Sequence, residues 1–196
     1  MSAYPPASVP VPPDATPTTD RFGRRAMRWF VISRLVQEND WREGVEVGTA
    51  DGRCTEAVLA ACPRLRMTTL DPWRPQPGHC GPEDWRDWPH AENERKARAR
   101  LARFSDRCRI LKTYSKDAAD TFASGSLDFV FLDGDHGLEG IRADIIMWRD
   151  KIRPGGMLLV HDINWPTVRA AADELIPGYW IAPNNVAGIS LPTDLM

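Results

Sequence analysis

The sequence predicts a single α/β domain in which a mostly parallel sheet is covered by helices on both faces. Short apolar runs alternate with helical stretches along most of the chain, and this alternation implies right-handed crossovers between parallel strands. Two of the runs, Phe129–Leu132 and Met157–Val160, are apolar throughout, as central strands buried on both sides should be. These two observations predict a doubly wound fold.

The size and charge of the chain limit what kind of protein it is. Its 196 residues suffice for one domain with a sizeable core and are too few for two full domains. The net charge of −2 argues against a broad nucleic-acid surface, which usually makes a domain clearly basic. No apolar run approaches the roughly 18 residues of a spanning helix. We therefore expect neither nucleic acid nor a membrane as partner.

The first 20 residues are rich in proline and poor in large apolar side chains. Such a segment buries too little to offset the entropy of ordering it, which predicts a flexible tail over residues 1–20 and a domain over residues 21–196. The segment also lacks the early positive charge and apolar stretch of a signal peptide. The four cysteines are scattered without a C-x-x-C pair, so a reduced, cytoplasmic protein fits best.

The elements follow from periodicity and from turn residues. A first helix is expected over Phe22–Glu38, with Met27, Phe30, Val31, Leu35 and Val36 on its apolar face. Strands are expected at Gly44–Val47, Met67–Leu70, Arg109–Leu111, Leu127–Leu132 and Gly156–Val160. Helices are expected between them at Cys54–Ala61, Ala91–Phe104, Lys116–Phe122 and Leu138–Ile152.

Two proline-containing segments complete the pattern. Pro154-Gly155-Gly156 is expected to turn the chain from the last of these helices into a strand. After a helix near Pro166–Leu175, two short strands at Tyr179–Ile181 and Val186–Leu191 are joined by Pro183-Asn184-Asn185. These two strands predict a closing antiparallel hairpin, which brings the sheet to seven strands.

Polar residues collect where the predicted strands end. The strands are followed by Gly48–Gly52, Asp71-Pro72-Trp73, Tyr114-Ser115, Asp133-Gly134-Asp135-His136 and His161-Asp162-Ile163-Asn164. In a doubly wound sheet, ligands bind in the crevice beyond the carboxyl ends of the strands. The sequence therefore predicts a binding site built from these loops.

The first loop differs from a dinucleotide-binding fingerprint. Ala50 stands where the second glycine of G-x-G-x-x-G belongs, and Arg53 stands in place of the third. That second glycine lets backbone approach a pyrophosphate, so a pyrophosphate ligand is disfavoured. Asp71, at the end of the next strand, is placed where a carboxylate binds ribose hydroxyls. A ligand with a ribose but without a pyrophosphate fits both observations.

Three ordered motifs resemble those of class I S-adenosylmethionine-dependent methyltransferases, whose fold is Rossmann-like. They are Val45-Glu46-Val47-Gly48-Thr49-Ala50-Asp51-Gly52, Thr69-Leu70-Asp71-Pro72-Trp73 and Phe131-Leu132-Asp133-Gly134-Asp135-His136. The D-G-D-H motif, followed by a helix, a Gly-Gly and a strand ending in His-Asp, resembles small bacterial metal-dependent O-methyltransferases of the sugar and antibiotic type. Catechol O-methyltransferase is a more distant relative. The resemblance covers roughly residues 44–164.

The resemblance implies a role for individual residues. Gly48, Thr49 and Ala50 would hold the methionine part of S-adenosylmethionine with Glu46 beneath them, and Asp71, next to Pro72 and Trp73, would bind the ribose. Ser115 matches a position near the adenine. Asp133 and Asp162 match carboxylates that hold a divalent metal, with Asp133 also beside the cofactor. Asp135 matches the proposed general base, and His136 is the other candidate base.

One departure from the family pattern concerns the metal. His161 stands where the sugar enzymes carry a second acidic ligand, so the predicted metal set is Asp133, His161 and Asp162. Magnesium or manganese is the expected ion, although imidazole suits zinc, iron or manganese better than magnesium. A bound divalent ion eases deprotonation of a hydroxyl, and a nearby carboxylate or imidazole then takes the proton.

Structural interpretations compete at several of these positions. Asp133 is also a candidate cap for the following turn or helix, and His136 and His161 are candidates for structural hydrogen bonding. Asp144, on the next helix, is interpreted as a solvated or capping charge rather than as a ligand.

The sequence thus predicts a metal-assisted O-methyltransferase for a small hydroxylated acceptor. The alternatives are a metal-free methyltransferase that uses His136 or Asp135 as its base, and a non-catalytic cofactor-binding partner subunit. The segment Arg74–His90 is rich in proline and tryptophan and is either an acceptor lid or a contact in a homo-oligomer.

Overall fold

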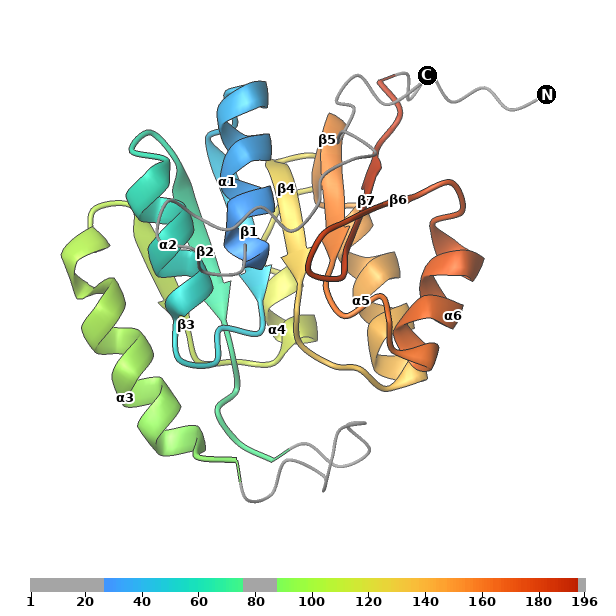
Figure 1. The fold of residues 1–196 in the computed structure, drawn as a ribbon. Coiled ribbons are helices and arrows are strands. Elements are labelled where there is room, and N and C mark those ends of the chain that lie inside the picture. Colours follow the sequence, from blue (N-terminus) through green and yellow to red (C-terminus); the bar gives the residue numbers. More distant parts are fainter. Residues whose placement is uncertain (1–26, 76–87, 194–196) are drawn as a thin grey trace.

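The computed structural model describes residues 27–75 and 88–193, which form one seven-stranded sheet between two layers of helices (Figure 1). The strand order is β3-β2-β1-β4-β5-β7-β6. The predicted tail over residues 1–20, the start of the predicted first helix and most of the segment Arg74–His90 lie outside the described residues. The predicted doubly wound fold class is confirmed.

The parallel part of the sheet consists of β1 (Glu43–Val47), β2 (Arg66–Leu70), β3 (Cys108–Leu111), β4 (Leu127–Leu132) and β5 (Ile152–Val160). β6 (Trp180–Ala182) and β7 (Val186–Ser190) pair antiparallel with one another, and β7 pairs antiparallel with β5. The predicted C-terminal hairpin is therefore present, and it extends the sheet on the β5 side.

Two hydrophobic cores lie on the two faces of the sheet. One face carries α1 (Arg28–Asn39), α2 (Arg53–Ala61) and α3 (His90–Leu101), which continues into a 3-10 turn at Ala102–Phe104. The other carries α4 (Ser115–Ala119), α5 (Leu138–Arg149) and α6 (Pro166–Leu175). β4 serves both cores, because Phe129 and Phe131 face the first layer whereas Val130 and Leu132 face the second. This alternation follows from the two-residue period of a strand.

Three helix predictions are corrected by the structure. α5 ends at Arg149 instead of Ile152, and α4 ends at Ala119 instead of Phe122. The apolar face of α1 also differs, because Met27 and Phe30 are exposed and Ile32 is buried beside Leu35 and Val36. The apolar side chains of Phe122 and Ile152 fit the helical periodicity, which extended the two predicted helices beyond their observed ends.

The segment Pro154-Gly155-Gly156 lies inside β5 and does not precede it. Ile152 already pairs with Leu127, and the register between the two strands shifts before Phe129 pairs with Met157. A Cβ on Gly156 would lie 2.4 Å from the Asp128 carbonyl oxygen. The glycines therefore allow an irregular, close strand pairing, a use of glycine that is common at bulges.

The strand order reverses between β1 and β4, so the loops that follow these two strands meet at the carboxyl edge of the sheet. Ligands of doubly wound sheets bind at this switch point. Among the described residues, no helix has the length and apolar character needed to cross a membrane.

Candidate functional site

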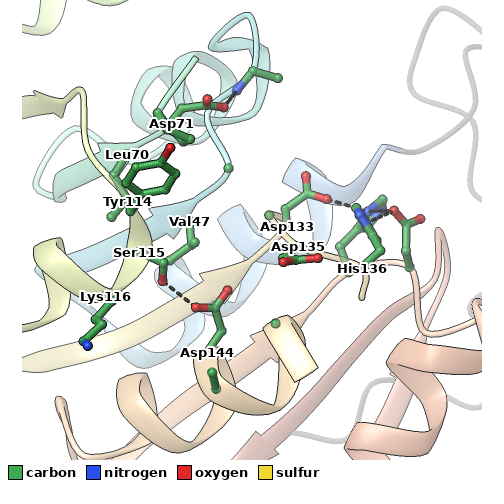
Figure 2. Close-up of a pocket in the computed structure, with 18 of the residues that line it drawn as sticks. Val47, Leu70, Asp71, Tyr114, Ser115, Lys116, Asp133, Asp135, His136 and Asp144 are labelled. Atoms are coloured by element: carbon green, nitrogen blue, oxygen red, sulfur yellow. Dashed lines mark hydrogen bonds and ion pairs between the residues drawn. The ribbon is translucent and has the colours of Figure 1, made fainter. Parts of the chain in front are cut away.

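A cavity of about 500 Å³ opens at the carboxyl ends of the parallel strands (Figure 2). This volume is typical of small-molecule sites. Its wall takes residues from the loops after β1, β2, β3, β4 and β5, from the first turn of α1 and from one face of α5. Most of the predicted site residues line it, namely Gly48, Ala50, Asp71, Pro72, Ser115, Asp133, Asp135, His136, His161 and Asp162.

The loop after β1 is held in a conformation that few residues adopt. Gly48 has φ +96°, and a Cβ there would lie 2.1 Å from the carbonyl oxygen of Asp133. Only glycine allows the β1 and β4 loops to approach so closely. Ala50 also has a positive φ of 47°, which costs a non-glycine residue free energy and is typical of functional loops.

Asp71 fastens this loop to the end of β2. One of its carboxylate oxygens accepts a hydrogen bond from the Ala50 backbone N–H at 2.9 Å, and the other accepts from the Trp73 N–H at 2.7 Å. The Trp73 indole donates in turn to the Ala50 carbonyl at 2.8 Å. Because each carboxylate oxygen has two lone pairs, Asp71 is able to hold the loop and still accept from a ligand.

Three of the predicted cofactor residues, Glu46, Thr49 and Trp73, are buried and do not line the cavity. The side chains of Thr55 and Thr69 donate hydrogen bonds to the buried Glu46 carboxylate. Burial raises the pKa of Glu46, although hydrogen bonds to Cys54 and Thr55 oppose the rise. These residues support the loop from below.

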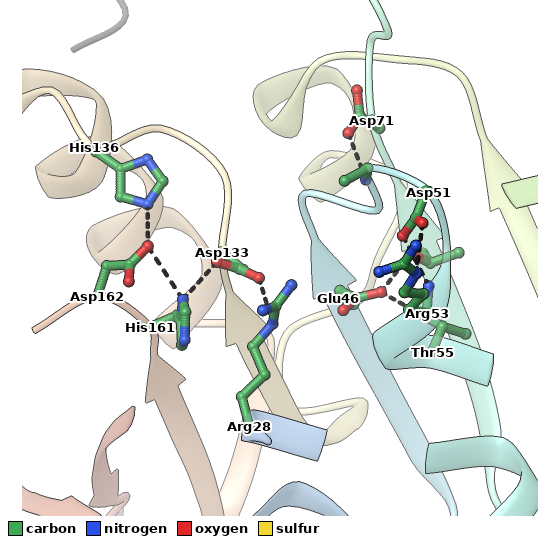
Figure 3. A network of polar contacts seen from close by, with 12 residues as sticks. Arg28, Glu46, Asp51, Arg53, Thr55, Asp71, Asp133, His136, His161 and Asp162 are labelled. Atoms are coloured by element: carbon green, nitrogen blue, oxygen red, sulfur yellow. Dashed lines mark hydrogen bonds and ion pairs between the residues drawn. The ribbon is translucent and has the colours of Figure 1, made fainter. Parts of the chain in front are cut away.

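An acid–base cluster connects the ends of β4 and β5 (Figure 3). His161 Nδ1 lies 2.9 Å from an Asp133 oxygen and 3.2 Å from an Asp162 oxygen. The second Asp133 oxygen lies 2.9 Å from Nε of Arg28, which comes from the first turn of α1. His136 Nε2 lies 2.9 Å from Asp162. Two carboxylates are thus surrounded by one guanidinium and two imidazoles.

These contacts set the charges of the cluster. Burial lowers the pKa of His161, but Asp133 and Asp162 outweigh it and raise that pKa to about 9. Burial raises the pKa of Asp162, yet contacts with His136 and His161 outweigh it and hold the pKa well below its usual range. Burial lowers the pKa of Arg28, but the negative charge of Asp133 outweighs burial, and the pKa is raised.

Local structure fixes His136 and Asp162 in this cluster. Asp162 has a positive φ of 52°, a strained conformation for a non-glycine residue. The His136 ring packs against Trp165 at a centroid distance of 4.9 Å, and the His136 carbonyl accepts a hydrogen bond from Thr167 at 2.6 Å. The imidazole is therefore held between α6 and the end of β5.

Asp135 has a structural contact in addition to its place in the cavity wall. One of its oxygens accepts a hydrogen bond from the Gly137 N–H at 2.7 Å, at the start of α5. A Cβ on Gly140 would lie 2.1 Å from the other oxygen. It is Asp135, rather than Asp133, that accepts this hydrogen bond in the turn just before α5, and the N-cap of that helix, Gly137, makes no side-chain capping hydrogen bond.

Asp144 is not the solvated charge that the sequence suggested. It is 5% exposed, lines the cavity and accepts a hydrogen bond from the Ser115 hydroxyl at 2.5 Å. The Trp148 indole donates to the same Ser115 oxygen at 2.8 Å. Helical periodicity identified the buried face of α5 through its apolar residues, but Asp144 lies on that face beside Ile145 and Trp148.

A metal-binding geometry exists within the cluster. Asp133, His136 and Asp162 each offer one ligand atom, and these atoms lie within 4.8 Å of one another. Two carboxylates and an imidazole suit manganese, iron or zinc. The set shares Asp133 and Asp162 with the predicted one, but His136 takes the place of His161. A metal at this point would compete with the contacts that Arg28 and His161 make to the same carboxylates.

The sequence motifs did not indicate Arg28. It lies on a helix far along the chain from Asp133 and belongs to no motif, so only the packing of α1 against the sheet brings the two together. Trp88, at the edge of the segment Arg74–His90, also lines the cavity. Residues 76–87 of that segment lie outside the described residues, so its predicted role as an acceptor lid or an oligomer contact stays a prediction.

Comparisons with known proteins agree with this geometry. A family model described as a methyltransferase domain matches residues 45–163. No curated protein sequence matches the chain.

Solved structures share its fold at low sequence identity. An O-methyltransferase from Bacillus cereus in complex with S-adenosylhomocysteine has 18% identity and a TM-score of 0.58, with 82% of this chain and 77% of that chain covered. The Streptomyces achromogenes O-methyltransferase TomG, involved in tomaymycin synthesis and bound to S-adenosylmethionine, has 16% identity and a TM-score of 0.60, with 85% of this chain and 80% of that chain covered. A Podospora anserina methyltransferase bound to S-adenosylhomocysteine has 13% identity and a TM-score of 0.62, with 85% of this chain and 78% of that chain covered.

Proposed function

This chain belongs to the methyltransferase domain family, and on that premise we propose that it transfers a methyl group from S-adenosylmethionine to a hydroxyl oxygen of a small acceptor. The observation that carries the proposal is the cavity itself. It joins Asp71, the candidate ribose-binding carboxylate, to an acid–base cluster at the ends of β4 and β5. S-adenosylmethionine would bind at the Asp71 side of the cavity, and the acid–base cluster would supply groups that deprotonate a hydroxyl.

The pair formed by Asp133 and Arg28 supports an amino-acid ligand. The α-amino and α-carboxylate groups of the methionine part carry opposite charges, and a carboxylate next to a guanidinium matches them. Asp133 would receive the ammonium and Arg28 the carboxylate, beside the close approach of Gly48. Their present contact leaves the guanidinium partly paired, so ligand binding would rearrange it.

Binding of S-adenosylhomocysteine tests the donor directly. Calorimetry should detect it for the wild-type protein, and Asp71→Ala should weaken it at least tenfold, about 1.4 kcal/mol, because the ribose hydroxyls lose their acceptor. Thermal unfolding serves as the control that the variant is folded. Unchanged affinity in a folded variant would exclude Asp71, and NAD binding of equal strength would argue against the donor itself.

The acceptor oxygen forms a bond to the methyl carbon as the carbon–sulfur bond breaks and its electron pair moves to sulfur. The hydroxyl proton passes to Asp135 or His136. Because the methyl donor is already electrophilic, alignment of the acceptor supplies much of the acceleration, roughly 7–11 kcal/mol in well-aligned reactions. The cavity of about 500 Å³ must hold donor and acceptor together, which favours a small acceptor.

A divalent metal fits the donor atoms of Asp133, His136 and Asp162. When bound, it would make the acceptor hydroxyl more acidic. Asp133, His136 and Asp162 would then hold the ion. Asp135 would receive the proton of the acceptor hydroxyl. Exhaustive chelation followed by addition of manganese or magnesium tests this role, since activity should disappear and return.

A metal-free reaction is the second candidate, and a specific observation favours it. Arg28 and His161 already neutralise the two carboxylates, and Asp162 orients the His136 ring at 2.9 Å. A carboxylate that orients an imidazole is a common arrangement for a general base. Full activity after exhaustive chelation would decide for this candidate. Absence of turnover with any acceptor, despite donor binding, would instead favour the non-catalytic partner subunit.

A further inference from the structure

Arg28 brings a permanent positive charge to the acid–base cluster from outside the motif loops. Figure 3 shows its side chain extending from α1 toward Asp133, which lies between Arg28 on one side and His161 on the other. Nε of Arg28 lies 2.9 Å from one carboxylate oxygen of Asp133. A guanidinium does not lose its proton in a protein, so this charge is present at any pH near neutrality.

The contact between Arg28 and Asp133 is an ion pair without an aligned hydrogen bond. Nε of Arg28 is buried, and within the described part of the chain it has no hydrogen-bond partner. At the other end of β4, by contrast, Nε of Arg153 donates a hydrogen bond to Asp128 at 2.6 Å. Moving Nε of Arg28 away from Asp133 therefore breaks an ion pair but no aligned hydrogen bond.

The same carboxylate is one of the three candidate metal ligands. The ligand atoms of Asp133, His136 and Asp162 lie within 4.8 Å of one another. A cation 2.9 Å from an oxygen of Asp133 repels a second cation that approaches the same carboxylate. A metal at these three residues therefore has to displace the guanidinium of Arg28 or bind more weakly in its presence.

His161 also contacts Asp133, but it is less free to move. Its side chain is 13% exposed, and its ring packs edge-on against Phe131 at a centroid distance of 6.0 Å. The Arg28 side chain is 27% exposed, and its long flexible stem allows the charged head to turn toward water. Arg28 is thus the cation beside Asp133 that a metal displaces more easily.

We propose that Arg28 competes with the divalent metal for Asp133 and so sets the affinity of the site for the metal. The inference rests on the proposed function, in which Asp133 is one of the residues that hold the ion, and it adds the residue that regulates this site. Removal of the charge of Arg28 should strengthen metal binding, although Arg28 itself offers no ligand atom. A residue that only stabilised the fold would have no such effect.

The test measures the binding of Mn²⁺ alone, without donor or acceptor, by calorimetry and by the electron paramagnetic resonance signal of free Mn²⁺. Arg28→Met keeps a long apolar stem and removes the charge, so it should bind Mn²⁺ roughly tenfold or more tightly than the wild-type protein. Arg28→Lys retains a positive charge and should stay within about threefold of the wild type. Equal affinity of the wild type and Arg28→Met, or no binding by either, would overturn the proposal. Binding by Arg28→Lys as tight as by Arg28→Met would overturn it too, because charge would not be the cause.

Arg34→Met is the matched control, since it removes the same charge from the same helix. Arg34 pairs with Glu38 at an exposed position and does not line the cavity, so the Mn²⁺ affinity should equal that of the wild type. An equal gain in Arg34→Met would indicate a general charge effect and contradict the proposal. Thermal unfolding checks that each variant is folded, and Arg28→Gln replaces Arg28→Met if the methionine variant is not.

Asp133→Asn, combined with Arg28→Met, tests where the ion binds. The tighter binding should disappear in the double variant, because the competition takes place at Asp133. Tight binding that survives there would indicate an adventitious ion only and would refute the proposal. If S-adenosylhomocysteine does not bind the wild-type protein, the proposed function fails, whereas the comparison of Mn²⁺ affinities still decides the role of Arg28.

Discussion

The two ends of β4 carry aspartates that are equally buried and differently used. The Asp128 side chain, near the amino end, is 11% exposed, and the Asp133 side chain, just past the carboxyl end, is 9% exposed. Asp128 accepts hydrogen bonds from the backbone N–H groups of Arg42 and Glu43 at 2.5 and 2.8 Å and from the Arg153 guanidinium at 2.6 Å. The contacts of Asp133 described above come from the side chains of Arg28 and His161.

This difference distinguishes a structural carboxylate from a candidate functional one. Backbone N–H groups cannot leave, so Asp128 joins the start of β1 to β4 and β5 permanently. Side-chain cations can rotate or exchange, so a ligand or an ion is able to replace them at Asp133 and Asp162. Burial alone does not reveal the role of an acidic residue, whereas the kind of partner does. Substitutions at the two ends should therefore affect different measurements.

The largest effect on turnover is expected from Asp162→Ala. This change removes a ligand of the candidate metal site and the carboxylate that orients His136, so the rate should fall by about 10⁴-fold. Affinity for S-adenosylhomocysteine should stay within a few fold. The free energy of unfolding should fall because His136 and His161 stabilise the ionised Asp162 in the fold, but it should fall less than in Asp128→Ala because no backbone N–H loses its partner. Steady-state kinetics, calorimetry and urea unfolding measure the three quantities. A large loss of stability would make Asp162 resemble Asp128.

Asp135→Asn should lower turnover by roughly 10²-fold or more, the contribution typical of a general base. The asparagine oxygen still accepts the hydrogen bond from Gly137, so stability should be preserved and the rate loss reports the lost base. The content of bound metal, measured on the purified variant, should equal that of the wild type. Equal loss of metal would make Asp135 a ligand, and an unchanged rate would leave His136 as the base.

Gly140→Ala changes the position of Asp135 without removing its carboxylate. Alanine ordinarily favours a helix interior over glycine by about 1 kcal/mol. Here its Cβ would lie 2.1 Å from the Asp135 oxygen, so the side chain must move. Turnover should fall about tenfold, because small displacements of reacting groups are costly. Urea unfolding of the same variant measures the effect of helix propensity separately from the rate. Unchanged turnover in Gly140→Ala would show that the position of Asp135 is not critical.

At the other end of the strand, Asp128→Ala should act on stability alone. Removing the carboxylate leaves two backbone N–H groups and the Arg153 guanidinium without this partner, a loss of about 2–3 kcal/mol. Urea unfolding measures that loss, and turnover per folded molecule should stay at the wild-type value. A rate loss in the folded variant would mean that the two ends of β4 are coupled.

The sequence predicts the strands of this molecule well because its signals for them are local. Alternation and apolar runs located all seven strands, and Pro166 marked the start of α6. Helix ends were less predictable, since Ile152 fits the stripe of α5 yet pairs with Leu127 in the sheet. Whether an apolar residue continues a helix or begins a strand is decided by tertiary pairing.

The candidate site shows the same limit. Residues within motifs at the strand ends, such as Asp71 and Asp162, were found because topology places strand ends together. Arg28 and Asp144 were missed because no motif contains them. Arg28 reaches the site through helix packing, and the burial of Asp144 depends on its hydrogen bond with Ser115. His136 replaced His161 in the candidate metal set because the orientation of the His136 ring, which contacts Trp165 and Asp162, is not encoded by spacing.

The smallest expected effect is the change with pH in the contribution of Asp128 to the free energy of unfolding. Burial raises the pKa of Asp128, but hydrogen bonds from Arg42, Glu43 and Arg153 outweigh it and hold the pKa below 3.8. Its ionised form therefore favours folding. That contribution is complete above the unfolded pKa and is lost as the pH falls through the lower folded pKa.

Asp128→Asn removes the charge and keeps one oxygen acceptor, so it should destabilise the protein by about 1 kcal/mol at neutral pH. The difference in unfolding free energy between wild type and variant should be constant down to about pH 5 and should shrink as the pH falls below about 4. Urea unfolding of both proteins at several pH values measures it. A difference that persists undiminished at low pH would mean that Asp128 contributes through shape rather than charge, and the contrast between the two ends of β4 would then rest on geometry alone.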